Sequence, residues 1–453
     1  MRKIAVLLKF FKGELNPFDG AALECALEWG GEIWAVAMAP SSALPALEGV
    51  TRLGVRAVLI SDSAYAGSDT QATSYVLSEA LRRIAPDVIF TGRQSVDGDT
   101  GQVPPMISER MGLELIPSVM EFKDGRAICR DGMEYTCDNG AILSFERIRT
   151  LRFPSIFSKK GSVELWDNSK LGLDLSKCGL SGSPTRVVRS YESTVGRREC
   201  EFASIDKLDS LISDALAKEH SEGVSYSGEK LPCIYYFGDI ESIAAKYADN
   251  TVRLSAEGKS PRELADEISS LGAATVLFED SAEYKLLAPR IAVHTGAGIC
   301  ADCISFRVEG DRLVMTRPAL GGNVTADIVC TSDIAFATVR TVKRGESDVV
   351  FALGRGAIPF MDKIRPLAEK YGAELVCSRI LADNGKMPYS SQVGLTGRVI
   401  SPRVYVAFGI SGAVQHTCAI ASSGTVIAIN NDKDARIFDY ADYGIADGIE
   451  KLF

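Results

Sequence analysis

The stretch VYVAFGISGAVQH, residues 404–416, decides the fold of the C-terminal part of this chain. Val404 to Phe408 is a continuous apolar run typical of a buried parallel strand, and the glycine-serine turn after it predicts the start of a helix. A second apolar run, Thr425 to Ile429, follows. This order turns backbone N–H groups and the positive end of a helix dipole toward whatever lies above the turn. The stretch therefore predicts an α/β layer with an anion held at the turn.

Gln415 and His416 add two hydrogen-bonding side chains to that turn. An imidazole can carry positive charge near neutral pH, and an amide can donate and accept hydrogen bonds. A cofactor with both a phosphate and a redox-active ring would use both side chains. His416 could therefore carry positive charge at the binding turn.

The sequence around this stretch predicts a doubly wound nucleotide-binding layer. Strand 348–353 leads through GRGAIP into a helix to residue 371, and strand 373–377 follows. A last helix is expected over residues 443–452. Because the carboxyl ends of parallel strands meet at one edge, Arg355 and Arg379 are predicted to converge there on a phosphate or a flat ring.

The N-terminal segment also alternates strands and helices, which predicts βαβ units and a parallel sheet. The predicted strands are 4–8, 32–38, 57–61 and 87–91. Three helices are predicted: one that begins at Asn16-Pro17, one over 44–53 and one over 71–84. The loop TGRQSVDGDTGQVPP, residues 91–105, follows the fourth strand. Its backbone could form a phosphate nest assisted by Thr100 and Gln102, or it could be a plain loop with capping residues.

A weak internal repeat indicates that two related α/β halves follow one another. Residues 85–93 resemble 273–281, residues 104–112 resemble 288–296, and FKDGRAICR resembles VEGDRLVMTR. The offset stays near 185 residues, which is the pattern expected of a duplicated unit.

Composition excludes several classes of function. The chain has 453 residues, is 46% hydrophobic and 24% charged, and has a net charge of −9, which argues against nucleic acid as a partner. No apolar run reaches the roughly 20 residues that span a bilayer, so no membrane insertion is expected. Eleven cysteines without a framework favour a cytoplasmic protein with free thiols. The single CxxC, Cys300 and Cys303, is interpreted as structural, and no metal is expected.

The motifs at both ends resemble one family. The segments GRGAIP, SRILADNG, QVGLTG, VYVAFGISGAVQH and ADYGIAD resemble the FAD domain of the electron transfer flavoprotein alpha subunit, and TRPALGGN (316–323) resembles its first domain. NPFD (16–19) and TGRQSVDGDTGQV resemble the beta subunit. The chain thus looks like a fusion, beta part first. The resemblance implies three α/β domains: residues 1–220, residues 229–345, and an FAD-binding domain over residues 347–453.

The resemblance implies that the last domain holds FAD. Arg379 would lie over the flavin ring, Thr396 near its reactive nitrogen, and His416 at a ring carbonyl, where positive charge would stabilise the half-reduced flavin. The implied FAD-binding residues are Arg355, Ser378, Arg379, Gln392, Val393, Gly394, Leu395, Thr396, Ser411, Gly412, Ala413, Val414, Gln415, His416, Asn430 and Asp447.

The resemblance also implies a second nucleotide in the first domain, either AMP or a second FAD. Its implied ligands are Asn16, Pro17, Phe18, Asp19, Met38, Asp97, Gly98, Asp99, Thr100, Gly101, Gln102 and Val103. The chain departs from the family in Leu395, in a short loop before NPFD, and in a short partner-recognition loop over residues 153–165. These departures leave the FAD pocket largely intact and affect docking.

Three functions stay open at this level. The leading hypothesis is an electron carrier that takes electrons from a flavin dehydrogenase or NADH and passes them singly to a quinone, flavodoxin or ferredoxin type acceptor. The second is an electron-bifurcating flavoprotein with two FADs. The third is a non-redox nucleotide-binding regulatory or scaffold module.

Overall fold

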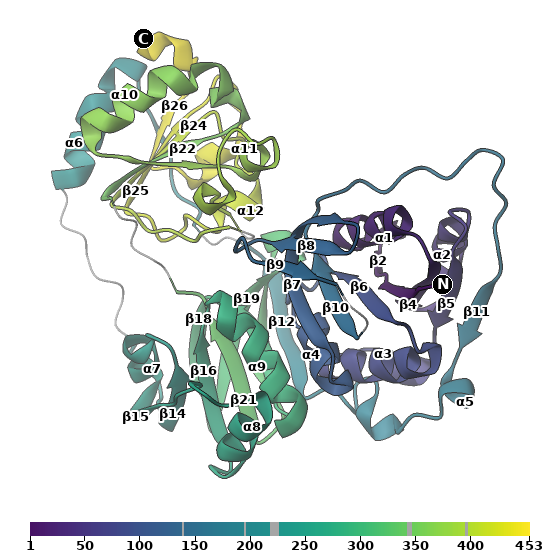
Figure 1. Cartoon of the computed structure of the whole chain (residues 1–453). Coiled ribbons are helices and arrows are strands. Elements are labelled where there is room, and N and C mark those ends of the chain that lie inside the picture. Colours follow the sequence, from purple (N-terminus) through teal and green to yellow (C-terminus); the bar gives the residue numbers. More distant parts are fainter. Residues whose placement is uncertain (138–139, 194–195, 218–225, 342–346, 395–396) are drawn as a thin grey trace. The chain divides into compact units, whose positions relative to one another are not determined.

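The computed structural model of the chain is an α/β protein that forms two compact units (Figure 1). It describes residues 1–453 except 138–139, 194–195, 218–225, 342–346 and 395–396. The first unit consists of Met1–Arg189, Gly228–Leu320 and Ala326–Val339, and the second unit of Ser190–Ser227, Gly321–Thr325 and Arg340–Phe453. The predicted fold class, α/β with parallel sheets, is confirmed.

The first half of the first unit is built on a sheet with the strand order β11-β5-β4-β1-β6-β10-β7-β8-β9. The strands from β11 to β7 run parallel, and β7, β8 and β9 are joined as antiparallel neighbours. Their bounds are β1 Lys3–Leu7, β4 Glu32–Met38, β5 Arg56–Ile60, β6 Val88–Gly92, β7 Glu114–Lys123, β8 Arg126–Cys129, β9 Glu134–Thr136, β10 Ala141–Phe145 and β11 Val163–Trp166. A separate hairpin joins β2 Phe10–Phe11 to β3 Glu14–Leu15.

Helices cover both faces of this sheet. Apolar residues of α1 and α2, such as Leu23 and Leu47, pack on one face, and those of α3 and α4, such as Val76 and Ile107, pack on the other. The helices are α1 Pro17–Trp29, α2 Leu44–Thr51, α3 Thr70–Ile84, α4 Val103–Met111 and α5 Asn168–Leu171. This packing places the turns that follow β1, β4 and β6 at one edge of the sheet, where an α/β protein binds its ligand.

The second half of the first unit repeats this arrangement with fewer strands. Its sheet has the order β15-β14-β16-β21-β17, which matches β4-β1-β6-β10-β7 of the first half. The elements are β14 Leu231–Phe237, α7 Glu241–Tyr247, β15 Ala248–Arg253, α8 Pro261–Ser269, β16 Ala274–Glu279, α9 Ala282–Thr295, β17 Gly298–Cys303 and β21 Ile334–Val339. A second sheet, β12-β20-β19-β18, contains β12 Thr185–Glu192, β18 Ser305–Glu309, β19 Arg312–Ala319 and β20 Val324–Cys330.

A shared backbone irregularity supports the predicted repeat and explains the CxxC. Ser118 in β7 and Asp302 in β17 both have a positive φ, 49° and 59°. The Ser118 N–H donates to the Ser144 hydroxyl at 3.0 Å, and the Asp302 N–H donates to the Thr338 hydroxyl at 2.8 Å. In each half the bulge interrupts the register with the neighbouring strand.

The two cysteines of the CxxC flank this bulge and are 2% and 0% exposed. The residues that flank the first bulge, Ile116 and Val119, are both 0% exposed. Cys300 and Cys303 therefore occupy core positions that the first half fills with aliphatic side chains. This placement agrees with a structural interpretation of the motif.

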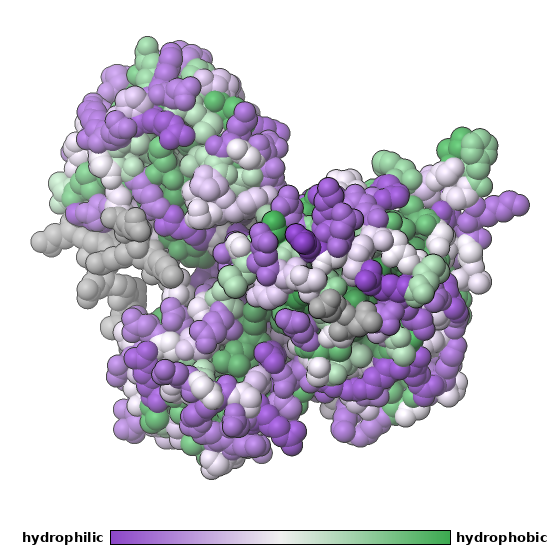
Figure 2. Space-filling model, in the orientation of Figure 1, coloured by the Kyte–Doolittle hydropathy of each residue, from purple (hydrophilic) through white to green (hydrophobic). Residues whose placement is uncertain are grey.

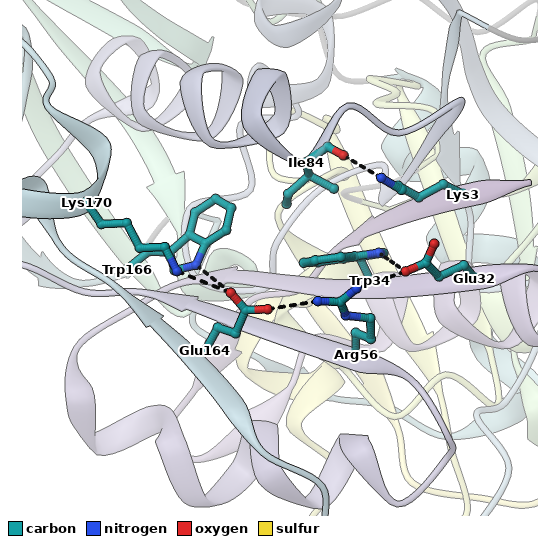
Figure 3. Close-up of polar contacts among 8 residues, drawn as sticks. All are labelled: Lys3, Glu32, Trp34, Arg56, Ile84, Glu164, Trp166 and Lys170. Carbon is teal, nitrogen blue, oxygen red and sulfur yellow. Dashed lines mark hydrogen bonds and ion pairs between the residues drawn. The ribbon is translucent and has the colours of Figure 1, made fainter.

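A network of charged and aromatic side chains holds β11 to the amino edge of the first sheet (Figure 3). The Arg56 guanidinium lies 3.7 Å from the centre of the Trp34 ring and 3.1 Å from a carboxylate oxygen of both Glu32 and Glu164. Because the network lies at the end opposite the ligand-binding edge, we interpret it as stabilising the attachment of the strand that follows the 146–162 loop.

The second unit is a parallel sheet with the order β13-β26-β25-β24-β22-β23. Its five C-terminal strands follow the order 2-1-3-4-5 of doubly wound nucleotide-binding folds. Apolar residues of α6, α10 and α11 pack on one face. The elements are β13 Glu201–Phe202, α6 Leu208–Ala217, β22 Val349–Leu353, α10 Met361–Tyr371, β23 Glu374–Cys377, α11 Arg379–Asp383, β24 Val404–Phe408, α12 Val414–Thr417, β25 Thr425–Ile429 and β26 Tyr443–Ile445.

Two expectations for this unit differ from the structure. The helix expected over residues 443–452 is wrong, because Tyr443–Ile445 pairs with β25 as strand β26 and only Ile449–Leu452 forms a short 3-10 helix. The segment from Ser190 to Ala217 was expected in the first domain, but β13 pairs with β26, and Leu208 and Ile212 join the core of the second unit. Short-range patterns do not show which sheet a distant strand joins.

Candidate functional site

The first candidate site lies at the carboxyl edge of the first sheet, where the loop after β6 meets the start of α1. The backbone N–H of Gly92 donates to one oxygen of the Asp19 carboxylate at 3.0 Å, and that of Lys9 donates to the other at 2.7 Å. A Cβ at position 92 would lie 2.6 Å from the Phe18 Cβ and overlap the Asp19 carboxylate. Gly92 is therefore required for this close approach of strand and helix.

Asp19 is buried, with 5% of its surface exposed. Burial raises the pKa of Asp19 to about 7, although hydrogen bonds from the backbone of Lys9 and Gly92 act in the opposite direction. The Lys9 ammonium lies 2.8 Å from Asp97 in the 91–105 loop. The loop is thus joined to the end of β1 by an ion pair and to α1 by a buried carboxyl group.

Two amide side chains of this edge keep buried polar atoms without a protein partner. Asn16 and Gln102 are each 2% exposed. Asn16 donates through Nδ2 to the Gln94 carbonyl at 2.9 Å, and the Gln102 Oε1 accepts from Thr70 at 2.9 Å. Among the residues that the structure describes, the Asn16 Oδ1 and the Gln102 Nε2 have no hydrogen-bond partner. Since an unpaired buried polar atom is costly, both atoms indicate a place for a ligand.

The chemistry of these atoms fits a nucleotide. An oxygen that only accepts complements an amino or hydroxyl group, and an amide nitrogen that only donates complements a phosphate or carbonyl oxygen. The backbone of Asp99 and Gly101 has positive φ angles of 50° and 63° on either side of Thr100. Alternation of this kind turns successive N–H groups toward one side of a loop and forms an anion nest.

The structure brings most of the predicted second-nucleotide residues to this edge. Asn16 precedes α1 and Pro17 is its first residue, although the Asn16 side chain does not cap the helix. Met38 ends β4, and Gln102 and Val103 begin α4. The Phe18 ring lies 5.6 Å from the guanidinium of Arg93, which in turn pairs with buried Glu146 at 2.7 Å. The remaining predicted residues, Asp97, Gly98, Asp99, Thr100 and Gly101, form the loop itself.

The second candidate site lies at the carboxyl edge of the second unit's sheet. The turns after β22 and β24 pack backbone against backbone, because a Cβ at Gly354 would overlap the Gly409 carbonyl and a Cβ at Gly409 would lie 2.7 Å from the Gly356 Cα. A Cβ at Gly412 would overlap the backbone of Ile437. These close approaches fix the strand ends and leave their polar side chains at one edge.

The predicted FAD residues at these strand ends differ in exposure. Arg355, Ser411, Ala413 and Gln415 are exposed, Ser378 and Arg379 are half-buried, and Asn430 is 8% exposed. Arg379 lies 3.2 Å from Asp383, and the Asn430 amide donates to the Ile410 carbonyl at 2.9 Å. Exposed arginine and hydroxyl groups above a glycine-rich parallel edge fit a dinucleotide with a pyrophosphate.

The remaining predicted residues lie on the loops beside these strand ends. Gln392 and Val393 are 2% and 1% exposed, and the Val393 N–H donates to the Cys377 carbonyl at 2.9 Å. A Cβ at Gly394 would lie 3.0 Å from the Gln415 carbonyl. Asp447 follows β26 and lies 2.7 Å from Lys451. Leu395 and Thr396 lie outside the described residues, so their predicted roles stay predictions.

The surroundings of His416 favour a neutral ring, whereas the family resemblance implies a cation. The ring is 6% exposed, its Nε2 lies 2.7 Å from the Tyr405 hydroxyl, and its Nδ1 lies 3.1 Å from the Val393 carbonyl. Because a carbonyl only accepts, Nδ1 carries the proton and Nε2 accepts from Tyr405. Burial lowers the pKa of His416 to about 4. The imidazole is therefore neutral at pH 7 and holds α12, a helix of four residues, to β24.

Sequence reasoning missed two residues of these sites. Tyr405 is fully buried in β24, where an apolar run gave no sign that its hydroxyl binds His416. Arg317 belongs to β19, about 220 residues after the loop whose carbonyls it contacts, with donor–acceptor distances of 2.8 and 3.3 Å. The arginine inside TRPALGGN, in a segment with few other charged residues, was the available signal.

The described part of the chain also contains a cavity outside these two sites. A cavity of about 510 Å³ lies at the carboxyl edge of the second half, between the ends of β14 and β15 and the start of α9; it is lined by Gly238, Arg253, Leu254, Ser255, Ala256, Glu257, Glu283 and Tyr284. Among the described residues, no cluster of three or more His, Cys, Asp or Glu side chains is arranged to hold a metal, and no helix is both long and apolar enough to cross a bilayer.

Comparison with protein families gives two matches that divide the chain as the folds do. The family described as the electron transfer flavoprotein domain matches residues 6–135 and 245–343. The family described as the electron transfer flavoprotein FAD-binding domain matches residues 345–421. The first match covers both halves of the internal repeat, and the second supports FAD as the cofactor of the second unit.

Similar proteins fall into beta-type and alpha-type groups. Protein FixA of Azorhizobium caulinodans is 34% identical over 237 residues, which is 45% of this chain and 83% of that protein. The electron transfer flavoprotein subunit beta of Clostridium acetobutylicum is 31% identical over 46% of this chain and 86% of its own length. The subunit alpha of Thermoanaerobacterium thermosaccharolyticum is 34% identical over 37% of this chain and 64% of its own length. Both types of subunit are therefore represented in one chain.

Proposed function

Since this chain belongs to the electron transfer flavoprotein family and joins beta-like and alpha-like parts, we propose that it is a single-chain, FAD-bearing electron carrier. It takes electrons from a flavin-containing dehydrogenase or from NADH and passes them one at a time to a quinone, flavodoxin or ferredoxin type acceptor. The observation that carries the proposal is the glycine-packed edge of the second unit, within a region that matches an FAD-binding domain.

In this proposal the second unit holds FAD. A bound flavin supplies one-electron and two-electron transfer. Arg355 and Ser411, exposed residues that follow β22 and β24, bind the pyrophosphate, and Asn430, directly after β25, fixes the turn after β24 through the Ile410 carbonyl. Arg379 supplies the positive charge beside the flavin, because a guanidinium stays protonated where the buried imidazole is neutral.

The role of His416 in this proposal is to hold the binding turn. Its bonds to Tyr405 and Val393 connect α12 to β24 and to Val393, so that two segments with proposed flavin contacts are joined to the sheet. A neutral imidazole keeps that arrangement unchanged across the physiological pH range. Flavin retention is therefore expected to be independent of pH between about 6 and about 8.

The first unit holds a second adenine nucleotide, AMP or FAD, at the loop after β6. The support is the pair of buried and unpaired amide atoms of Asn16 and Gln102 and the alternating backbone around Thr100. An AMP at this position would serve the carrier, and a second FAD would make the chain a bifurcating protein. The two outcomes differ in flavin content, which decides between them.

The loop before β11 is the proposed docking surface for the electron donor. Phe153, Ile156 and Phe157 are 95%, 85% and 86% exposed, and Figure 2 shows hydrophobic surface along this loop. Arg52 anchors the segment that carries Ile156 and Phe157 by donating to the flanking Ser155 and Ser158 carbonyls at 3.0 and 3.1 Å. Exposed aromatic side chains on an anchored loop are typical of binding hot spots.

A reduction assay tests the proposed carrier function. The protein with its flavin is mixed with catalytic amounts of a flavin dehydrogenase and its substrate, or with NADH alone, and the flavin absorbance is followed. The proposal expects reduction by at least one donor and reoxidation by a one-electron acceptor. If none of these donors reduces the flavin, the proposed carrier function is contradicted and the regulatory alternative is supported.

A further inference from the structure

One arginine of the second half holds the nucleotide loop of the first half. Arg317, in the antiparallel strand β19, is 4% exposed. Its Nη1 donates to the Gly98 carbonyl at 2.8 Å and its Nη2 to the Asp99 carbonyl at 3.3 Å. Three residues further on, the Leu320 N–H donates to the Asp97 carbonyl at 3.0 Å. The second half therefore binds three consecutive carbonyls of the loop.

These contacts determine which way the loop presents its amides. In a planar trans peptide the C=O and N–H groups point in opposite directions. When Arg317 holds the Asp99 carbonyl, the N–H of Thr100 in the same peptide unit points away from the guanidinium. Thr100 lies between two residues with positive φ, so the amides of this segment can gather on the side opposite Arg317.

Arg317 also carries a buried donor that the described protein does not use. Its Nε has no hydrogen-bond partner among the described residues, like the Asn16 Oδ1 and the Gln102 Nε2. A guanidinium remains charged when buried, and an incompletely paired buried charge is costly. An anion beside the loop would lower this cost, so the charge of Arg317 favours a phosphate there.

The corresponding hairpin of the first half behaves differently. Its second strand, β8, is followed by Arg130, which lies 3.5 Å from Glu146 in the same half. Arg317 instead extends to a loop that precedes it by more than 200 residues. The arrangement in the second half is therefore not a simple consequence of the repeated fold.

We propose that Arg317 is a positioning residue for the nucleotide site of the first unit. It holds the Gly98 and Asp99 carbonyls so that the following amides face the phosphate, and it adds positive charge behind the loop. The inference rests on the proposed second nucleotide. It adds that the alpha-like part of the chain, and not the beta-like part alone, determines nucleotide affinity.

The test compares three variants of the full chain. Arg317→Gln removes the charge and the two-pronged donor, Arg317→Lys keeps the charge without the fork, and Arg312→Gln is the matched control on the same strand, since the Arg312 side chain is 51% exposed. The first readout is the Kd for AMP of protein freed of its own nucleotide. We expect about a tenfold increase for Arg317→Gln, a smaller increase for Arg317→Lys and no change for Arg312→Gln.

The second readout is amide hydrogen exchange of the peptide covering residues 93–102 in the nucleotide-free protein. We expect about tenfold faster exchange in Arg317→Gln and wild-type exchange in Arg312→Gln, because the loop loses two of its tethers. Retained flavin absorbance reports that the second unit is intact. If Arg317→Gln does not fold, Arg317→Lys decides by the same two readouts.

The outcomes separate this inference from the proposed second nucleotide. Wild-type protein that binds neither AMP nor FAD in the first unit contradicts the second nucleotide and with it a positioning role toward that ligand. Wild-type binding together with unchanged Kd and unchanged loop exchange in Arg317→Gln contradicts the role of Arg317 alone. Weaker binding with faster loop exchange supports both.

Discussion

The two halves of the first unit share a strand order and differ at the edge where a ligand binds. In the first half the strand β6 ends in Gly92 and continues into a loop of ten residues before α4. In the second half the strand β16 ends in Glu279, and α9 begins three residues later. The first edge contains buried amide atoms without partners among the described residues, whereas the second surrounds an open cavity with Glu257 and Glu283 in its lining.

This difference shows that the site depends on the loop and not on the fold. Both halves place the ends of their first strands at a topological switch point, where α/β proteins bind ligands. Within the described residues, the first half ends β6 in a glycine where the second half ends β16 in Glu279, and the first half adds the buried carboxyl of Asp19 and the nest around Thr100. A duplicated scaffold can thus carry a nucleotide site in one copy and serve as a support in the other.

The largest expected effect is that of a side chain at Gly92. Gly92→Val should lower the free energy of unfolding by at least about 3 kcal/mol and abolish nucleotide retention in the first unit, because the new side chain would overlap Asp19 and Phe18. Urea unfolding and nucleotide analysis measure both effects. Gly49→Ala is the matched control, since a Cβ at Gly49 meets nothing within 4 Å. If Gly92→Val were as stable as the wild type, the packing of β6 against α1 would not require a glycine at position 92.

The second effect is a pH dependence carried by Asp19. The pKa of Asp19 is about 7 in the folded protein and has its ordinary value of 3.8 in the unfolded chain, so the native chain keeps a proton that the unfolded chain has lost, and stability falls as pH rises through 7. Nucleotide-free wild type should lose about 2–3 kcal/mol between pH 5 and 8 relative to Asp19→Asn. Asp174→Asn should keep the wild-type pH profile between pH 5 and 8, because hydrogen bonds from Ser176 lower the pKa of Asp174 and the group is ionised in both the native and the unfolded chain there. Parallel pH profiles of wild type and Asp19→Asn would contradict the burial argument.

A third effect concerns the second unit, where the buried polar groups of the His416 cluster are already paired. Tyr405→Phe should cost about 2 kcal/mol, because the His416 Nε2 loses its donor while it stays buried. Tyr389→Phe, which removes an exposed hydroxyl bound to Asp383, should change stability by less than about 0.5 kcal/mol. Equal stability of the two variants would show that the histidine has another partner.

NMR titration of the same imidazole checks its charge directly. Because the pKa of His416 is lowered to about 4, the unfolded chain binds a proton before the native chain does as pH falls. The stability contributed by the neutral ring is complete above pH 6.5 and is lost toward pH 4. If the His416 imidazole titrates near pH 6.5 in the native protein, it can act as a cation and the burial argument is contradicted.

The smallest effect tests the equivalence of the two halves. The double substitution Cys300→Val with Cys303→Val should cost about 1 kcal/mol or less per position and leave nucleotide content unchanged, because Ile116 and Val119 fill the same places in the first half. Burial raises the pKa of Cys303 well above its usual range, so this thiol should resist alkylation in the native protein. Loss of bound nucleotide in the double variant would indicate a functional role for the CxxC.

The sequence predicted those parts of the fold that depend on local pattern. The strands Glu32–Met38, Val404–Phe408 and Thr425–Ile429 have the predicted bounds, because continuous apolar runs between turns are specific for buried parallel strands. The helix expected over 443–452 failed because Tyr443–Ile445 is a short strand of the sheet, whose pairing with β25 depends on distant residues. The pairing of β13 with β26 was missed for the same reason.

The candidate sites show the same limit at the level of side chains. Glycines and polar residues after predicted strands indicated both edges, because strand ends converge in any parallel sheet. The charge of His416 could not be predicted, since it depends on burial beneath Tyr405 and the Val393 carbonyl. Arg317 could not be assigned to the nucleotide loop, since the contact requires the two halves to be packed together.

The most direct test of the account is the identification of the nucleotides released when the purified protein is denatured. Chromatography with stoichiometry should find one FAD per chain from the second unit and one further adenine nucleotide, AMP or FAD, from the first. Colourless protein that also fails to take up added FAD would contradict the central claim that the chain is a flavin-bearing carrier.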